Sequence, residues 1–238
     1  MKKLAAFMLM LFCFSAYADV TITEKSTEAD MVTYFSKNIT AHYINGQLTN
    51  ITDMKKGVIY VFNPMNKTYF QATFAELKQF ADKAAEQMNS MAENPQYKQY
   101  MNQMQGSGIT VVKTGTQVIA GFSCDEYKVA SPMTVSVVCL SKDLMTLVKK
   151  EVDTSKAEKI MNSLDMESAG NILGKKLAEL EDKYGYIVSE KFSSPIPGMA
   201  AEDETRVISV SKKMINPMIF NIPTGYKQVK MQDAVGEY

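Results

Sequence analysis

The chain has 238 residues, of which 46% are hydrophobic and 22% are charged. This composition is typical of a globular protein with one large core or two small ones. The 26 basic residues balance the 26 acidic ones, and the chain contains a single arginine and a single histidine. Because nucleic-acid binding normally requires a basic face rich in arginine, the composition disfavours that class of function.

The first eighteen residues have the three parts of a secretory signal peptide. Two lysines give a positive start, residues 4–14 form an uncharged apolar run, and Ala16 and Ala18 are the small residues that a signal peptidase reads. The run is too short to cross a bilayer about 30 Å thick. We therefore expect cleavage after Ala18, and a mature chain of residues 19–238 that forms a single domain and is not an integral membrane protein.

The mature chain expected from this cleavage has 220 residues and a formal charge of −2, because the two lysines of the signal leave. Such a short, lysine-led signal is typical of bacteria, so we expect a periplasmic protein, with secretion as the alternative. Cys124 and Cys139 remain, and a disulfide is the default in an oxidising compartment. If Ser131 and Pro132 form the tip of a hairpin, the two cysteines face one another across its strands.

The segment over residues 19–73 has the pattern of an antiparallel meander of four or five strands. Residues 31–44 are rich in β-branched and aromatic side chains, and Asn45-Gly46 is a strong signal for a hairpin turn. Residues 58–62 are apolar on both faces of the expected strand, so this strand needs a cover on each side.

Two helical regions interrupt the strands. Thr73 and Glu76 form a capping box before the first region, which Pro95 interrupts before a short second helix to about Met104. Ser155 begins another capping box, and the second region ends at Gly185. We expect strands between and after these regions over 109–112, 117–119, 124–130, 133–140, 186–191, 206–211 and 218–222. This order predicts one antiparallel sheet with two helical insertions, an α+β architecture.

The sequence contains no recognisable catalytic constellation. His42, the single histidine, cannot build a histidine metal site, and no nucleophile motif, phosphate-binding loop or dinucleotide fingerprint is present. The acidic residues are scattered and form no calcium loop. We therefore expect a protein that is not an enzyme and that needs no cofactor.

Methionines are frequent, and four of them form two pairs in the first helical region. Met88 and Met91, and then Met101 and Met104, are each three residues apart and therefore share a helix face. Thioethers are soft ligands that suit Cu(I), so a copper site is one interpretation. Packing against an apolar surface is the simpler one, because methionine fills irregular gaps and makes adaptable surfaces.

Aromatic side chains are concentrated on the expected strands. They either pack the sheet against its helices or line an apolar concave surface that holds a ligand. The ligand-lining candidates, with the helical residues that would cover them, are Tyr34, Tyr43, Tyr60, Phe62, Phe70, Phe80, Met88 and Met91.

Four local patterns occur in an order that resembles an exported bacterial family. They are KKGVIY leading into NPMNKTY at residues 55–69, IAGFSCDEY at 119–127, VCLSKDL at 138–144 and FNIPTGY at 220–226. The chain resembles the domain of unknown function numbered 4412 and, in outline, the LolA/LolB-like periplasmic lipoprotein carriers. The resemblance implies a curved antiparallel sheet, an open half-barrel, with helices on or in its concave face.

The same resemblance implies that the concave face holds lipid or the acyl chain of a lipoprotein. We therefore expect a periplasmic binding protein for an apolar ligand. Two alternatives stay open: an interaction or structural module that meets another protein of the cell envelope, and Cu(I) binding through the methionine pairs.

Overall fold

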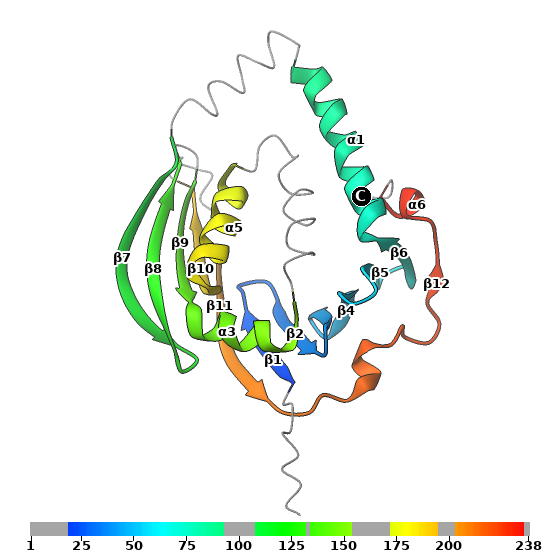
Figure 1. The fold of residues 1–238 in the computed structure, drawn as a ribbon, viewed down its shortest axis with the longest axis horizontal. Helices are drawn as coiled ribbons and strands as arrows, with labels where there is room; N and C mark the ends of the chain where they lie inside the picture. The colour runs from blue at the N-terminus through cyan, green and yellow to red at the C-terminus, as the bar shows by residue number, and fades with distance from the viewer. Residues whose placement is uncertain (1–18, 93–107, 132–133, 154–171, 195–202, 236–238) are drawn as a thin grey trace, which may run out of the picture.

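The computed structural model describes residues 19–92, 108–131, 134–153, 172–194 and 203–235. These residues form one twelve-stranded sheet that curves around helices in its interior (Figure 1). Its neighbouring strands are antiparallel, except for the short last strand at one edge. The prediction of an α+β half-barrel with helical insertions is confirmed.

The first half of the chain builds one side of the sheet as a meander that ends in a helix (Figure 1). Its elements are β1 Val20–Lys25, β2 Asp30–Ser36, β3 Ile39–Ile44, β4 Gln47–Asp53, β5 Val58–Asn63, β6 Thr68–Thr73 and α1 Phe74–Ala92.

This meander has six strands where four or five were expected, because a turn at Lys37 and Asn38 divides β2 from β3. Both residues have positive φ values, 48° and 67°. Contacts from a distant segment hold the turn: the Asn38 N–H donates to the Glu151 carbonyl, and its side-chain oxygen accepts from the Asp153 N–H, each at 2.9 Å. Since no glycine or proline marks this turn, the local sequence did not reveal it.

The second half of the chain builds the other side of the sheet and returns to the first. Its elements are β7 Thr110–Ile119, β8 Phe122–Ala130, β9 Val135–Ser141, α3 Lys142–Glu151, α5 Ile172–Tyr184, β10 Tyr186–Ser193, β11 Asp203–Lys212, the 3-10 helix η1 Pro217–Phe220, β12 Lys227–Gln228 and α6 Met231–Val235. The expected strands over 109–112 and 117–119 are one continuous strand, β7, in which the register shifts by one residue at Thr114, between Lys113 and Gly115.

The order of strands is β12-β6-β5-β4-β3-β2-β1-β11-β10-β9-β8-β7. Strand β1 pairs with β11, with Val20 opposite Lys212, and this pairing joins the two halves into one sheet. Strands β12 and β7 stand at the two ends of this order and are therefore the two edges of the sheet.

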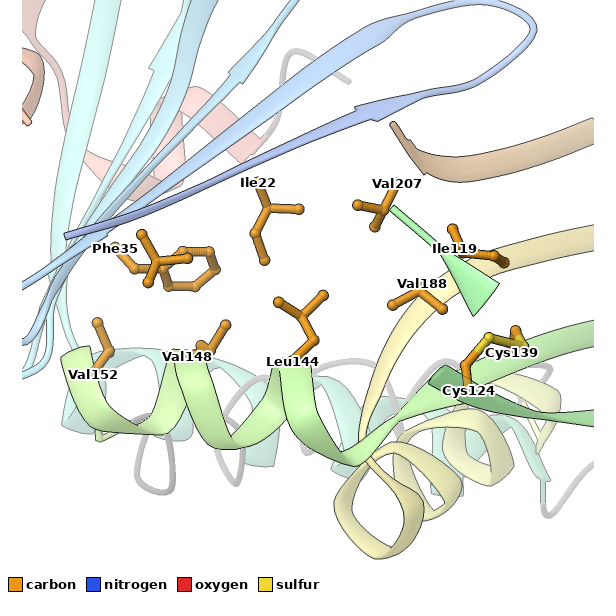
Figure 2. Packing of buried hydrophobic residues seen from close by; sticks show 11 residues of the cluster. Ile22, Phe35, Ile119, Cys124, Cys139, Leu144, Val148, Val152, Val188 and Val207 are labelled. Atoms are coloured by element: carbon orange, nitrogen blue, oxygen red, sulfur yellow. A yellow bond between two sulfur atoms is a disulfide. The ribbon is translucent and has the colours of Figure 1, made fainter. Parts of the chain in front are cut away.

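Helix α3 organises the central core, although we did not expect a helix there. The Ser141 hydroxyl caps it by accepting from the Leu144 N–H at 3.3 Å. Leu144 and Val148 point from the helix toward β1, β2, β10 and β11 (Figure 2), where they meet a buried cluster. The partners in this cluster are Val20, Ile22, Phe35, Ile119, Cys124, Cys139, Val152, Val188 and Val207. Burial of such aliphatic side chains stabilises the fold by about 1.5–3 kcal/mol each.

Helix α5 packs a second cluster on β8 and β9. Leu180 lies against Val138 and Leu140, and Tyr184 stacks on Tyr127 with ring centroids 4.8 Å apart. The helix ends where the sequence predicted, at Gly185, whose φ of 123° suits glycine.

The segment after β11 covers the outer face of the curved sheet rather than adding the strand expected over 218–222. Asn216 caps η1 by accepting from the Met218 N–H, and Pro217 favours the helical turn. The Tyr43 hydroxyl donates to the Ile219 carbonyl at 3.0 Å. Strand β5 therefore has the two covers that its sequence requires, α1 on one face and this segment on the other.

Asp19 connects the start of the sheet to this segment. It is 4% exposed, and it accepts from the Ser36 hydroxyl at 2.6 Å and from the Ile215 N–H at 2.7 Å. Burial of a carboxylate costs free energy unless it is hydrogen bonded, and these two contacts supply the hydrogen bonds that Asp19 needs. Asp19 is also the first residue after the expected cleavage site.

Cys124 and Cys139 form the expected disulfide between β8 and β9. The expected register was wrong by two residues, because Cys139 lies opposite Glu126 and the bridge is therefore diagonal. The turn is held by Ser131, whose N–H donates to the Thr134 carbonyl at 2.8 Å and whose hydroxyl accepts from the Thr134 N–H at 3.1 Å. Ser131 therefore faces Thr134, in line with the register of β8 and β9, which differs by two positions from the expected one.

Several predicted features lie outside the described residues. They are the signal peptide, the short helix before Met104 with Met101 and Met104, and the capping box at Ser155.

Candidate functional site

A groove of about 660 Å³ lies at the β12 edge of the sheet. Helix α1 forms one wall, and the chain from β12 into α6 forms the other (Figure 1). Its lining residues are Gln71, Ala72, Glu76, Gln79, Phe80, Lys83, Gln228, Val229, Lys230, Met231 and Gln232. The volume lies within the roughly 300–1,000 Å³ of typical small-molecule sites.

The first wall is fixed by the capping box that the sequence predicted at the start of α1. The Glu76 carboxylate accepts from the Thr73 N–H at 2.7 Å and from its hydroxyl at 2.8 Å, and the Glu76 N–H donates to that hydroxyl. Phe74, Leu77 and Ala72 pack this end of the helix on the sheet. The groove residues of α1 follow at spacings of three and four, so they form one helix face.

The second wall is fixed by backbone pairing to β6. The Lys227 N–H donates to the Lys67 carbonyl at 2.9 Å, and the Val229 N–H donates to the Tyr69 carbonyl at 2.8 Å. Met231 then packs against the residues that α1 covers. Both walls are therefore tied to β6, and the groove is part of the folded edge of the sheet.

The lining has an apolar part and a polar part. Ala72, Phe80, Val229 and Met231 supply the apolar surface, and the Phe80 ring is 37% exposed. Four glutamine amides supply groups that both donate and accept hydrogen bonds. This combination suits a ligand with an apolar body and a polar end.

Glu76, Lys83 and Lys230 are the charged side chains of the lining. The Thr73 N–H, followed by the Thr73 hydroxyl, holds the pKa of Glu76 below its ordinary value. Glu76 is therefore a carboxylate at neutral pH, and its charge serves the helix start.

The predicted ligand-lining residues do not share one surface. Tyr34, Tyr43, Tyr60 and Phe62 lie on the outer face, in a cluster with Ile219, Phe220 and Tyr226 of the C-terminal segment. Phe70 lies on the opposite face beside α1, and Phe80 lines the groove. The fold places Met88 and Met91 in α1.

The four outer aromatic residues form a packed cluster. Tyr34 and Tyr43 meet edge to face with ring centroids 5.6 Å apart, and Phe62 meets Tyr226 in the same way at 5.5 Å. Their role in the described structure is to seat the C-terminal segment, since such ring pairs contribute about 0.5–1.5 kcal/mol beyond the area that they bury.

His42 lies on the face of β3 opposite to these rings. Its Nδ1 is 2.9 Å from the Thr33 hydroxyl oxygen, and burial lowers its pKa. Among the described residues, Thr33 is the side-chain hydrogen-bond partner of the His42 ring, and this pair does not form a nucleophile–base–acid arrangement. In the described parts of the chain, no three His, Cys, Asp or Glu side chains gather where they could hold a metal ion.

Sequence reasoning missed most of the groove because its second wall comes from residues 227–232, which carry no motif. The α1 wall could have been found: Glu76, Gln79, Phe80 and Lys83 follow the spacing of one helix face, beside the buried face of Leu77.

The fold and this site define an open, curved α+β sheet protein with a ligand-sized groove at one edge. Residues 17–226 match the family model described as a domain of unknown function, DUF4412, and the chain belongs to this family. No curated protein matches the chain significantly. Among the described helices, none combines the length and the apolar character needed to cross a bilayer.

Solved structures that match the chain in part include PNGF-II in a C2 space group and MucB, the latter alone and in complex with MucA(peri). For PNGF-II the identity is 10% and the TM-score 0.42, over 92% of this chain and 32% of the other. For MucB in the complex the values are 5% and 0.32, over 85% and 53%. For MucB alone they are 6% and 0.28, over 84% and 55%. The chain thus spans about a third of the PNGF-II structure and just over half of each MucB structure.

Proposed function

We propose that the protein is an exported, non-enzymatic binding protein that holds a lipid or acyl chain in the groove between α1 and α6. The observation that carries this proposal is the apolar surface of Ala72, Phe80, Val229 and Met231 inside a groove of about 660 Å³. An apolar chain that leaves water for this surface gains about 25 cal/mol for each Å² that it buries.

Phe80 gives the strongest single argument for a ligand. It lies on α1 between the buried residues Leu77 and Ala81, yet 37% of its surface is exposed and faces the groove. A ligand that covers this ring would complete the apolar surface.

Export is supported by the signal peptide expected from residues 1–18 and by the Cys124–Cys139 disulfide, a bond that persists in oxidising compartments. We propose a binding protein rather than an enzyme because the one carboxylate of the groove lining, Glu76, accepts hydrogen bonds from Thr73 at the start of α1. Cargo binding is therefore a better fit to this lining than acid–base chemistry.

Native mass spectrometry of the purified mature protein, followed by titration with a fluorescent fatty acid, tests the proposal. We expect a co-purifying lipid or saturable binding at one site. Phe80→Ser should weaken that binding at least tenfold, because it removes the exposed ring from the groove.

Phe192→Ser is the matched control, since Phe192 on β10 is also 37% exposed and lies outside the groove. It should leave the affinity unchanged. Absence of any lipid and of any saturable binding would overturn the proposal, as would an equal loss in both variants.

A further inference from the structure

We propose that the ligand of the groove is an anion, whose carboxylate or phosphate head is bound by Lys83 of α1 and Lys230 at the start of α6. This inference rests on the proposed function and specifies its ligand. The shared chemistry is an apolar chain with a negatively charged head, which a free fatty acid and an acidic lysophospholipid both supply.

The two lysines come from the two walls of the groove. Lys83 lies on the same face of α1 as Phe80, three residues further along the helix, and Lys230 lies between the groove residues Val229 and Met231. Each lysine thus has an apolar groove residue beside it. An apolar chain on Phe80 and Val229 would place its head near the ammonium groups.

Neither lysine is neutralised by the described part of the protein. The ion pairs of the described residues involve other cations; on α1, for example, Lys78 pairs with Asp82 at 2.7 Å. Glu76 is the one acidic residue of the lining, and the Thr73 capping box engages its Oε2. With two ammonium groups and one engaged carboxylate, the lining carries an excess of positive charge.

Glutamine amides near the two lysines can also bind an anionic head. Gln79 lies one turn before Lys83, and Gln228 and Gln232 flank Lys230 at a distance of two residues. Their NH₂ groups can donate to the oxygens of a carboxylate or phosphate, and such hydrogen bonds to a charged group are stronger than those between neutral groups. A cationic head would instead meet two ammonium groups, which disfavours it.

Binding of palmitate and of its uncharged methyl ester to the mature protein tests the inference. We expect the wild-type protein to bind palmitate at least tenfold more tightly at pH 8 and low salt, and to lose part of this preference in high salt. The double variant Lys83→Gln/Lys230→Gln should bind the two ligands equally, with unchanged affinity for the ester. Lys213→Gln, which changes an exposed lysine outside the groove lining, should keep the preference.

Two further probes distinguish the sources of the head. Lysophosphatidylglycerol that binds more tightly than palmitate would indicate a lipid headgroup, and the reverse order would indicate a free fatty acid; both orders support an anionic ligand. Zwitterionic lysophosphatidylcholine should bind at least tenfold more weakly than the tighter of the two.

The outcomes separate this inference from the proposed function. Equal binding of palmitate and its ester by the wild-type protein would overturn the anionic head and leave acyl-chain binding in place. A preference for palmitate that survives in the double variant would also overturn the role of the two lysines. Failure of all these probes to bind would overturn both proposals.

Discussion

Glu24 is a half-buried carboxyl group on β1, and it accepts a hydrogen bond from the Tyr186 hydroxyl at 3.4 Å. Burial raises the pKa of Glu24, and the hydrogen bond from Tyr186 opposes this shift in part. Burial also raises the pKa of Tyr186 well above its ordinary value, so the hydroxyl remains a donor. Burial therefore makes the protonated form of Glu24 more favourable in the folded protein than in water.

The sign of the pH dependence follows from this raised pKa. The folded state binds a proton at Glu24 more readily than the unfolded state, so this residue costs no stability below the unfolded pKa of about 4.3. The cost appears as the pH rises through the raised folded pKa, and it is complete above it. We expect Glu24→Gln to raise the free energy of unfolding by about 1 kcal/mol at pH 8.

Urea denaturation at pH 8 and at pH 4 measures this difference. The variant should be the more stable protein at pH 8, and its advantage should shrink at pH 4, where Glu24 of the wild type is neutral. Asp30→Asn, which changes an exposed carboxylate on β2, should show no comparable gain. A gain from Glu24→Gln that is equal at the two pH values would contradict the mechanism.

The elements show how much of this fold the sequence could predict. Strand β5, α1 with its capping box, and the end of α5 at Gly185 were predicted because each depends on a local pattern. The division of β2 from β3 was missed because distant contacts to Asn38 hold the turn. The pattern of residues 218–222 predicts a strand, but Pro217 and the hydrogen bond from Tyr43 on the outer face of the sheet favour the 3-10 helix η1.

The candidate site was predicted only in part for the same reason. Phe80 was found because it belongs to the periodic face of α1, whereas Val229 and Met231 reach the groove through the parallel pairing of β12 with β6. Tyr34 and Tyr60 have the alternation of strand residues, but alternation does not say which face a later segment covers. That cover is a tertiary contact, made by Ile219 and Phe220.

The junction between α5 and β10 requires a glycine. Gly185 has a φ of 123°, and a Cβ atom added to it would lie 2.3 Å from the Ser141 carbonyl oxygen. The backbone of Ser141 cannot withdraw easily, because Ser141 also caps α3 and pairs with Tyr186. We expect Gly185→Ala to lower the free energy of unfolding by about 2–4 kcal/mol.

Gly108→Ala provides the matched control, because a Cβ atom at Gly108 meets nothing within 4 Å and the residue has no positive φ. Its unfolding midpoint in urea should stay close to that of the wild type. A Gly185→Ala variant as stable as this control would show that the junction does not need the close approach of the two backbones.

At the scale of the whole molecule, the groove and the disulfide belong to opposite ends of the strand order. The groove uses β6 and β12, whereas Cys124–Cys139 joins β8 to β9. The pairing of β1 with β11 connects these two halves of the sheet. A change at the disulfide should therefore alter the stability of the sheet without changing the shape of the groove.

Replacement of both cysteines by alanine tests this separation. The bridge spans 15 positions, and its loss should lower the free energy of unfolding by about 3 kcal/mol, because the unfolded chain regains the entropy of an open loop. The affinity for a fluorescent fatty acid should stay within about twofold of the wild type while the protein is folded. If binding disappeared although circular dichroism and the unfolding transition showed an intact fold, the disulfide would have to act on the ligand site, and its assignment as a purely structural bridge would be wrong.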